Sequence, residues 1–163
     1  MNHVRDIIMK SPENQKKFKF MRAALLEAAK ADAKDEVPVG AVVVYQDKII
    51  ARAHNLREKN QAFHAHAEFL AMMKAAKKIG SWRLEDCDVY VTMEPCPMCA
   101  GAMIQSRIKN LYYGTTDPKA GAVDSVTRLL DIPFNHTIHV EAGLLADECQ
   151  QIVKSFFKKL REK

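Results

Sequence analysis

Hydrophobic and polar residues alternate along this chain with periods that are typical of helices in some stretches and of strands in others. Apolar residues recur every three or four positions over Pro12–Ala33, which predicts an amphipathic helix capped by Ser11. Val39–Tyr45 is instead a run of apolar, mostly β-branched residues and predicts a strand. A second strand is predicted over Lys48–Ala53, and Gln46-Asp47 between the two runs predicts a tight turn. The chain therefore opens with a helix followed by a hairpin.

Beyond the hairpin, helical and extended patterns alternate to the end of the chain. Helices are predicted over His66–Ile79, Cys96–Ser106, near Val123–Leu130 and over Leu145–Arg161, and strands over Val89–Met93, Leu111–Tyr113 and near Ile138–Val140. Such alternation predicts a central mixed sheet with helices on its faces. No repeat, low-complexity tract or Pro/Gly-rich linker divides the sequence, so we expect residues 1–163 to form a single domain.

Composition and charge narrow the functional classes. The chain has 163 residues, 48% of them apolar, with 6 Gly and 6 Pro, which excludes a disordered protein. The longest uncharged stretch, Pro95–Ser106, is far shorter than the roughly 20 apolar residues of a membrane helix. Charges interrupt the first residues, so no signal peptide is predicted and we expect a cytoplasmic protein without a membrane partner.

The formal net charge of +5 is concentrated at the two ends of the chain. Residues 1–22 hold six bases against two acids, and residues 151–163 hold five bases against one acid. The middle of the chain is slightly acidic. Two basic ends favour a polyanionic partner.

Two short stretches carry the candidate chemistry, His64-Ala65-His66-Ala67-Glu68 and Pro95-Cys96-Pro97-Met98-Cys99. Two cysteines three positions apart in the first turn of a helix bring both sulfur atoms to one side. Two thiolates and one imidazole are a common zinc-binding set, and three ligands leave a fourth position open for a water molecule. We therefore predict a catalytic zinc ion held by His66, Cys96 and Cys99.

Glu68 is the candidate general acid and base. It follows His66 by two positions, too close to act as an independent ligand without crowding the tetrahedron, so we expect it beside the metal-activated water. Both ligand segments open predicted helices. The positive ends of the two helix dipoles should therefore face the thiolates and lower their pKa.

Other interpretations of these residues are weaker but stay open at this point. A lone Cys-x-x-Cys is often half of a structural zinc site or a redox motif, although the second pair of a zinc ribbon is absent. Cys87 and Cys149 are more typical of small buried apolar residues. His64 could replace His66 as a ligand, but it has no acid two positions later. We expect Glu94, beside Pro95, to be a helix-start acid rather than part of the site.

The chain resembles the bacterial tRNA-specific adenosine deaminases, within the cytidine and deoxycytidylate deaminase superfamily, from about Phe18 to Arg161. The matching stretches are Glu36–Ala41, His66–Glu68, Ser81–Leu84, Tyr90–Ile104, Ser106–Ile108, Asp117–Lys119, Phe134–His136 and Leu145–Cys149. The resemblance implies a cytidine-deaminase-like α/β fold, a three-layer α/β/α sandwich with a five-stranded mixed sheet.

The resemblance also implies an activity, the hydrolytic deamination of adenosine to inosine at the wobble position of a tRNA anticodon, usually that of an arginine tRNA. In such an enzyme one zinc ion per chain, on His66, Cys96 and Cys99, activates a water molecule, and Glu68 transfers the protons. The target base is flipped out of its stack, which costs less in a single-stranded loop. Members of the family form homodimers in which the partner can complete the RNA site.

The family further implies which residues contact the substrate. Asn55 and Val37 correspond to positions beside the target nucleoside. Positions around the anticodon loop correspond to Asp117, Lys119, Asn135, Phe157 and Arg161. Phe157 and the basic C-terminal segment could instead form a core anchor with a solvated charged face. Asp124 departs from the family, which commonly has Gly there, so the conformation of its loop is left open.

Two other functions compete with this hypothesis. A deaminase of a small molecule such as guanine or cytidine would share the zinc ligands and Glu68. A noncatalytic zinc module that binds nucleic acid would explain the basic charge but gives no reason for Glu68. The basic ends and the Asp117-Pro118-Lys119 segment favour an RNA substrate.

Overall fold

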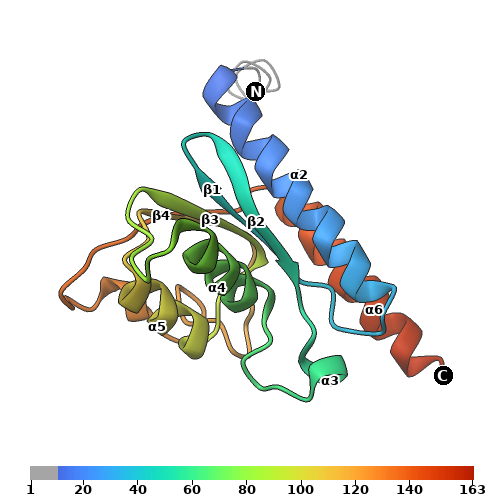
Figure 1. The fold of residues 1–163 in the computed structure, drawn as a ribbon. Helices are drawn as coiled ribbons and strands as arrows, with labels where there is room; N and C mark the ends of the chain where they lie inside the picture. Colours follow the sequence, from blue (N-terminus) through green and yellow to red (C-terminus); the bar gives the residue numbers. More distant parts are fainter. Residues whose placement is uncertain (1–10) are drawn as a thin grey trace, which may run out of the picture.

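The computed structural model describes residues 11–163, and in it a five-stranded mixed sheet lies between two layers of helices (Figure 1). The strands are β1 (Gly40–Tyr45), β2 (Lys48–His54), β3 (Cys87–Met93), β4 (Asn110–Thr115) and β5 (His139–Ala142). Their order across the sheet is β2-β1-β3-β4-β5, with β1 antiparallel to β2 and β3 and with β3, β4 and β5 parallel. The predicted three-layer sandwich is confirmed.

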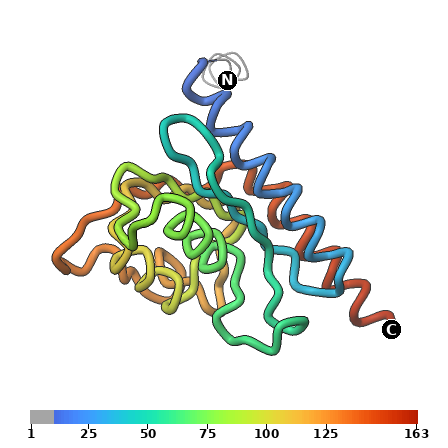
Figure 2. The backbone as a smooth tube through the Cα atoms, in the orientation of Figure 1, coloured from blue at the N-terminus to red at the C-terminus, as the bar shows by residue number. Residues whose placement is uncertain are grey.

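The two helix layers cover opposite faces of the sheet. Helices α2 (Pro12–Asp32) and α6 (Ala146–Arg161) lie side by side on one face, and α4 (Ala67–Ile79) and α5 (Pro97–Ser106) lie on the other (Figures 1 and 2). Because side chains alternate along a strand, β1 contributes to both cores. Val42 and Val44 pack on the α2 side, and Val43 packs on the α4 side.

The local signals at the start of the chain are confirmed. The Ser11 hydroxyl accepts a hydrogen bond from the backbone N–H of Asn14, which caps α2 as predicted. Gln46 and Asp47 both have positive φ angles, 51° and 62°, between β1 and β2. This is the geometry of a two-residue hairpin turn whose twist matches that of the strands.

The structure departs from the predicted elements in two places: one predicted helix does not form, and one short helix was not predicted. The helix predicted near Val123–Leu130 is wrong, because this segment forms turns and only a short 3-10 helix, η1 (Leu129–Asp131). Its backbone N–H groups at residues 123–125 donate to the carboxylate of Glu94, so the segment curls around that side chain. A short helix that was not predicted, α3 (Arg57–Asn60), follows β2.

The fold brings the chemistry-bearing segments to one edge of the sheet. The parallel strands β3 and β4 end near Met93 and Thr115, and α5 begins just beyond the end of β3. Open α/β sheets usually bind ligands at the carboxyl ends of their parallel strands. Within residues 11–163, the helices are all too short or too polar to cross a membrane.

Candidate metal and catalytic site

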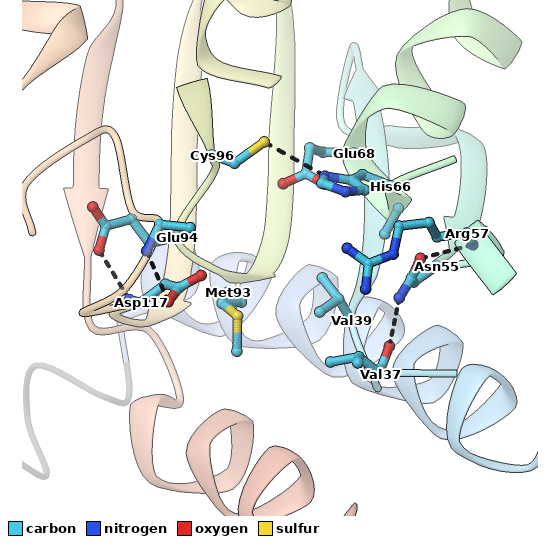
Figure 3. A pocket seen from close by; sticks show the side chains of 12 residues that line it. Val37, Val39, Asn55, Arg57, His66, Glu68, Met93, Glu94, Cys96 and Asp117 are labelled. Carbon is cyan, nitrogen blue, oxygen red and sulfur yellow. Dashed lines mark hydrogen bonds between the residues drawn. The ribbon is translucent and has the colours of Figure 1, made fainter. Parts of the chain in front are cut away.

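A pocket opens at the carboxyl ends of β3 and β4, where α4 and α5 begin (Figure 3). Residues from five parts of the chain meet there. The pocket is lined by Val37, Val39, Asn55, Arg57, His66, Ala67, Glu68, Met93, Glu94, Cys96, Asp117 and Ala120. Of the residues expected from the sequence, six therefore share one cavity: Val37, Asn55, His66, Glu68, Cys96 and Asp117.

His66, Cys96 and Cys99 form a compact group of metal-binding side chains whose ligand atoms all lie within 4.8 Å of one another. The Nδ1 atom of His66 lies 3.5 Å from the Sγ atom of Cys96 and 3.6 Å from that of Cys99. Tetrahedral zinc, with bonds of about 2.3 Å to sulfur and about 2.0 Å to nitrogen, places such a pair of atoms about 3.5 Å apart. The three side chains therefore fit a tetrahedral metal ion.

Helix starts position the three ligands. His66 is the N-cap residue of α4, Cys96 is the N-cap residue of α5, and Cys99 lies in the first turn of α5. The prediction that both ligand segments open helices is confirmed. Free N–H groups and the positive ends of two helix dipoles thus face the sulfur atoms and stabilise negative charge there.

The two thiols differ in pKa, because that of Cys96 is lowered and that of Cys99 is raised. The hydrogen bond that Cys99 donates, together with contact with His66, lowers the pKa of Cys96 to about 4 against the effect of burial. The hydrogen bond that Cys99 donates to Cys96 raises the pKa of the Cys99 thiol, and burial raises it further. The hydrogen bond to Cys96 also raises the pKa of His66. These contacts therefore favour the thiolate form of Cys96, which is the form that binds a metal ion.

Glu68 lies in the first turn of α4 beside this group, with a side chain that is almost completely buried. Burial disfavours its charged form and raises its pKa to about 7, although a backbone N–H and His66 act in the opposite direction. A carboxyl group with this pKa can take up and release a proton at neutral pH. Figure 3 shows its carboxyl group directed toward Cys96 and His66.

Asn55, which follows β2, also lines the pocket. Its Nδ2 atom donates to the carbonyl oxygen of Val37, and its Oδ1 atom accepts the N–H of Arg57, at 3.1 and 3.0 Å. These two bonds fix the orientation of the amide and leave one N–H and part of the oxygen available to a ligand. Val37 and Val39 supply an apolar wall beside it.

The prediction that Glu94 is a helix-start acid is wrong. The buried carboxylate of Glu94 faces the loop that follows β4. It accepts hydrogen bonds from the backbone N–H groups of Asp117, Val123, Asp124 and Ser125 and from the Ser125 hydroxyl. An added Cβ on Gly121 would overlap this carboxylate, so only glycine fits there.

The Glu94 contacts also define the conformation of the loop that contains Asp124. The backbone N–H of Asp124 faces Glu94, while its side chain points outward and pairs with Arg128 at 2.6 Å. Asp117 is held in the pocket lining by the same Glu94 carboxylate. An isolated acid before a proline gives no local signal of such a long-range role.

Four of the expected substrate residues lie outside the pocket lining. Lys119 is exposed on the loop beside Asp117, to which its backbone N–H donates. Asn135 is exposed in the segment before β5, and Arg161 is exposed at the end of α6. Phe157 is 39% exposed on α6, with its ring edge against Phe156.

The remaining candidates have structural surroundings. His64 packs against the rings of Phe63 and Phe69 and is not part of the metal-binding group. Cys87 and Cys149 are fully buried in the two cores, as expected for small apolar residues. Arg57, in contrast, lines the pocket although no motif in the sequence singled it out.

Replacing Glu94 by Gln should destabilise the loop of residues 117–125. Glutamine offers one acceptor oxygen and turns an NH₂ group toward N–H donors, so the expected cost is about 1–3 kcal/mol for each donor left unpaired. Burial raises the pKa of Glu94, but the bonds from Ser125 and its neighbours outweigh that effect and lower it. The carboxylate's stabilisation is therefore complete above the ordinary value of 4.5 and is lost as pH falls through the lower folded value.

The measurement is urea unfolding of wild type and Glu94→Gln between neutral and acidic pH. The stability difference between the two proteins should be largest at neutral pH and should shrink below about pH 4.5. Both proteins share the metal-binding group, so its protonation cancels in the comparison. A difference that stays constant with pH would contradict the assignment of the charged form.

Comparisons with known proteins agree with this geometry. Residues 15–161 match the family model of the MafB19-like deaminases. A tRNA-specific adenosine deaminase of Bacillus subtilis (strain 168) is 49% identical over 145 residues, covering 88% of this chain and 90% of that protein. A protein of the same name from Haemophilus influenzae is 47% identical over 146 residues, covering 88% of this chain and 84% of that protein.

Solved structures extend the comparison to the fold. A structure from work on A-to-I editing by tRNA:A34 deaminases superposes with a TM-score of 0.80 at 44% identity, covering 82% of this chain and 98% of that chain. A guanine deaminase from Nitrosomonas europaea superposes with a TM-score of 0.74 at 24% identity, over 90% of this chain and 84% of its own, and shares the fold alone. The chain belongs to the deaminase family and, within it, to the tRNA-specific adenosine deaminases.

Proposed function

We propose that this protein deaminates adenosine to inosine at the wobble position of a tRNA anticodon, with an arginine tRNA as the expected substrate. The observation that carries the proposal is one pocket in which a three-donor metal-binding group adjoins a buried carboxyl group, Glu68. The relatives of the same name, 47–49% identical over most of the chain, support the choice of substrate.

The proposed cofactor is one zinc ion per chain, held by His66, Cys96 and Cys99. One imidazole and two thiolates are a preferred donor set for zinc, and their mutual distances fit tetrahedral coordination. A zinc ion held by these three residues would keep one position for a ligand that is not part of the protein. When bound, zinc supplies the Lewis acidity that lowers the pKa of a water molecule at that position to about 7.

Glu68 is the proposed catalytic residue and moves the protons of the reaction. Water adds to C6 of the adenine ring, and the carboxylate of Glu68 takes up the proton that the water loses. Glu68 passes this first proton to the ring nitrogen N1. The new hydroxyl group on C6 then gives up its proton, which Glu68 passes to the amino group, so that the bond between C6 and that nitrogen breaks, ammonia leaves and the C6 carbonyl of inosine forms. A pKa of about 7 suits a group that must both accept and donate protons at neutral pH.

The other residues of the pocket lining are proposed to hold the substrate. Asn55 keeps one amide N–H for hydrogen bonding with the nucleoside, and Val37 would offer an apolar surface to the base. Asp117 lies at the pocket edge, and Lys119 is exposed beside it on the loop that Glu94 organises. A base must leave its stack to enter this pocket, which a single-stranded anticodon loop permits at low cost.

Residues farther from the pocket are proposed to bind the rest of the anticodon stem-loop. Asn135, Phe157 and Arg161 are exposed, and α6 also carries Lys158 and Lys159 near its end. Such a basic helix end would contact RNA phosphates and make binding fall as salt rises. Because tRNA is the substrate, the cytoplasm is the proposed location, and residues 1–163 are proposed to act as one deaminase domain.

We also propose a homodimer formed through the outer surface of α4 and α5. An apolar groove there is lined by Phe69, Trp82, Met98, Ala102, Gln105 and Ser106. Trp82 is 58% exposed and Met73, nearby on α4, is 52% exposed. Contiguous exposed apolar surface of this kind is typical of an interaction site, and a second chain of a homodimeric family is the proposed occupant.

The purified protein should convert adenosine to inosine in an anticodon stem-loop of an arginine tRNA and hardly at all in free adenosine. It should carry about one zinc ion per chain, measured by atomic absorption. Inosine is measured by reverse transcription and sequencing of the RNA. Release of ammonia from free guanine or cytidine, with an unreactive stem-loop, would instead favour a small-molecule deaminase, and binding of the stem-loop without reaction would favour a noncatalytic zinc module.

Single substitutions distinguish the role of the metal ligands from that of Glu68. Glu68→Ala should retain the zinc ion and lose activity by at least about 10²- to 10⁴-fold, because the carboxyl group transfers protons without binding the metal. Cys96→Ala should lose both the metal and stability. Glu85→Ala, which removes an exposed acid paired with Arg83, is the control and should change neither property. Loss of zinc from Glu68→Ala would show that its role is misassigned.

The dimer is tested by sedimentation. The wild-type protein should sediment as a dimer, and Trp82→Glu should shift it toward the monomer because a charge would be buried in the interface. Leu26→Glu is the matched control, because Leu26 is 65% exposed on α2 in the opposite layer. A wild-type monomer at micromolar concentration, or equal effects of both substitutions, would contradict this interface.

A further inference from the structure

Arg57 is a charged residue of the pocket lining that has no role in the proposed mechanism. It belongs to α3, and Figure 3 shows its guanidinium group extending into the pocket above Asn55 and toward His66. Of the twelve described residues that line the pocket, Arg57 is the sole lysine or arginine. Three of the others, Glu68, Glu94 and Asp117, are acids.

The Arg57 guanidinium group has no strong partner within residues 11–163. The contact recorded for it is with the carboxylate of Glu58, at 3.8 Å, and both side chains are at least half exposed. An exposed pair at this distance contributes little to stability, so the guanidinium group can change partners at low cost. A fixed positive charge at the mouth of a binding pocket is thus available to a ligand.

The backbone beneath Arg57 is held firmly on both sides. Its own N–H donates to Asn55, the residue proposed to contact the nucleoside. The next two N–H groups, of Glu58 and Lys59, donate to the two carboxylate oxygens of Glu36, each at 2.9 Å. Glu36 is 1% exposed, so it anchors α3 from the interior. The position of Arg57 relative to Asn55 is therefore set before any ligand binds.

We infer that Arg57 binds a phosphate group next to the target nucleotide and that Glu36 positions it. This inference rests on the proposed function. A planar guanidinium group forms two parallel hydrogen bonds with a phosphate and is the preferred partner for that group. A nucleoside with C6 beside Glu68 and its sugar near Asn55 brings its backbone toward the pocket mouth, where Arg57 lies. Without Arg57, that phosphate would face the carboxylates of Glu68 and Asp117 with no countercharge in the lining.

The inference assigns substrate selection to this contact. A free nucleoside has no phosphate and cannot use Arg57, whereas a nucleotide within an RNA loop can. The pocket would then discriminate between free adenosine and adenosine in a polynucleotide through a group that does not touch the base. Arg57 is accordingly a binding residue, and Glu36 acts through it.

The test replaces single phosphates of the anticodon stem-loop by uncharged methylphosphonates, on the 5′ side of the target adenosine in one substrate and on the 3′ side in another. On the natural stem-loop, Arg57→Gln should lower kcat/KM by about 10- to 100-fold, mainly through KM, which is the size expected for a charge-assisted hydrogen bond. On the substrate that lacks the contacted phosphate, the wild type should show a similar loss, and Arg57→Gln should add little. The arm in which this occurs identifies the phosphate.

Two further variants serve as controls. Arg57→Lys keeps the charge without the paired donors and should lie between wild type and Arg57→Gln. Lys59→Gln removes an exposed charge from the same helix without touching the pocket lining, and its effect should be small and the same on all substrates. The salt dependence of binding should become shallower by about 0.7 in the log–log slope for Arg57→Gln, as expected for one lost phosphate contact in single-stranded RNA.

Glu36→Gln tests the positioning role. It should raise KM on the natural stem-loop but change little in the Arg57→Gln background, because the two residues act through one contact. Zinc content and thermal unfolding of each variant show whether the protein is intact. If Glu36→Gln fails to fold, the Arg57 series still decides the binding role.

The outcomes separate this inference from the proposed function. Equal losses for Arg57→Gln on natural and methylphosphonate substrates, or no loss on any, would overturn the phosphate contact while wild-type activity on the stem-loop still supports the deaminase. Additive losses for Glu36→Gln and Arg57→Gln would overturn the positioning role. A wild-type protein that is inactive on the stem-loop contradicts the proposed function, and the inference with it.

Discussion

The meeting of two helix starts at the end of one strand is the constraint on which the rest of the site depends. His66 begins α4 and Cys96 begins α5, and both helices pack on the same face of the sheet. That arrangement places an imidazole and two sulfur atoms at distances suited to a tetrahedral metal ion. The same helix starts offer N–H groups and positive dipole ends, which offset the negative charge of two thiolates. Geometry and electrostatics thus come from one feature of the fold.

Two buried carboxylates, those of Glu36 and Glu94, fix the backbone of segments that line the pocket. Glu94 gathers backbone N–H groups from the loop after β4 and so holds Asp117 at the pocket edge. Glu36 binds the N–H groups of α3 in the same way and holds Arg57. Removing a carboxylate from water is unfavourable unless hydrogen bonds replace those to water. Here the backbone N–H groups of the two segments supply these hydrogen bonds. Irregular loops therefore become as well positioned as the helices.

The pocket combines charges that would be unfavourable in most interiors. Glu68 is buried next to sulfur atoms, and burial raises its pKa to near neutrality. Arg57 is half exposed, so solvent screens its charge, and Val37 and Val39 add apolar surface to the pocket lining. Proton transfer and recognition of a polar substrate are thus separated in space. Under the proposed function, the nucleobase would enter the buried part of the pocket near Glu68, and the charged RNA backbone would stay at the solvent-exposed part near Arg57.

The elements with strong local signals and the metal-binding group could be predicted from the sequence alone. Ser11, the Gln46-Asp47 turn and the periodicity of the long helices depend on neighbouring residues, so their structures were predicted correctly. His66, Cys96 and Cys99 were recognisable because metal ligands need particular residue types at particular spacings. The contacts of Glu94 and Glu36 and the position of Arg57 in the pocket became visible only in the folded chain. Their partners lie far along the chain or across the pocket, and no local pattern records a contact whose two halves meet only when the chain has folded.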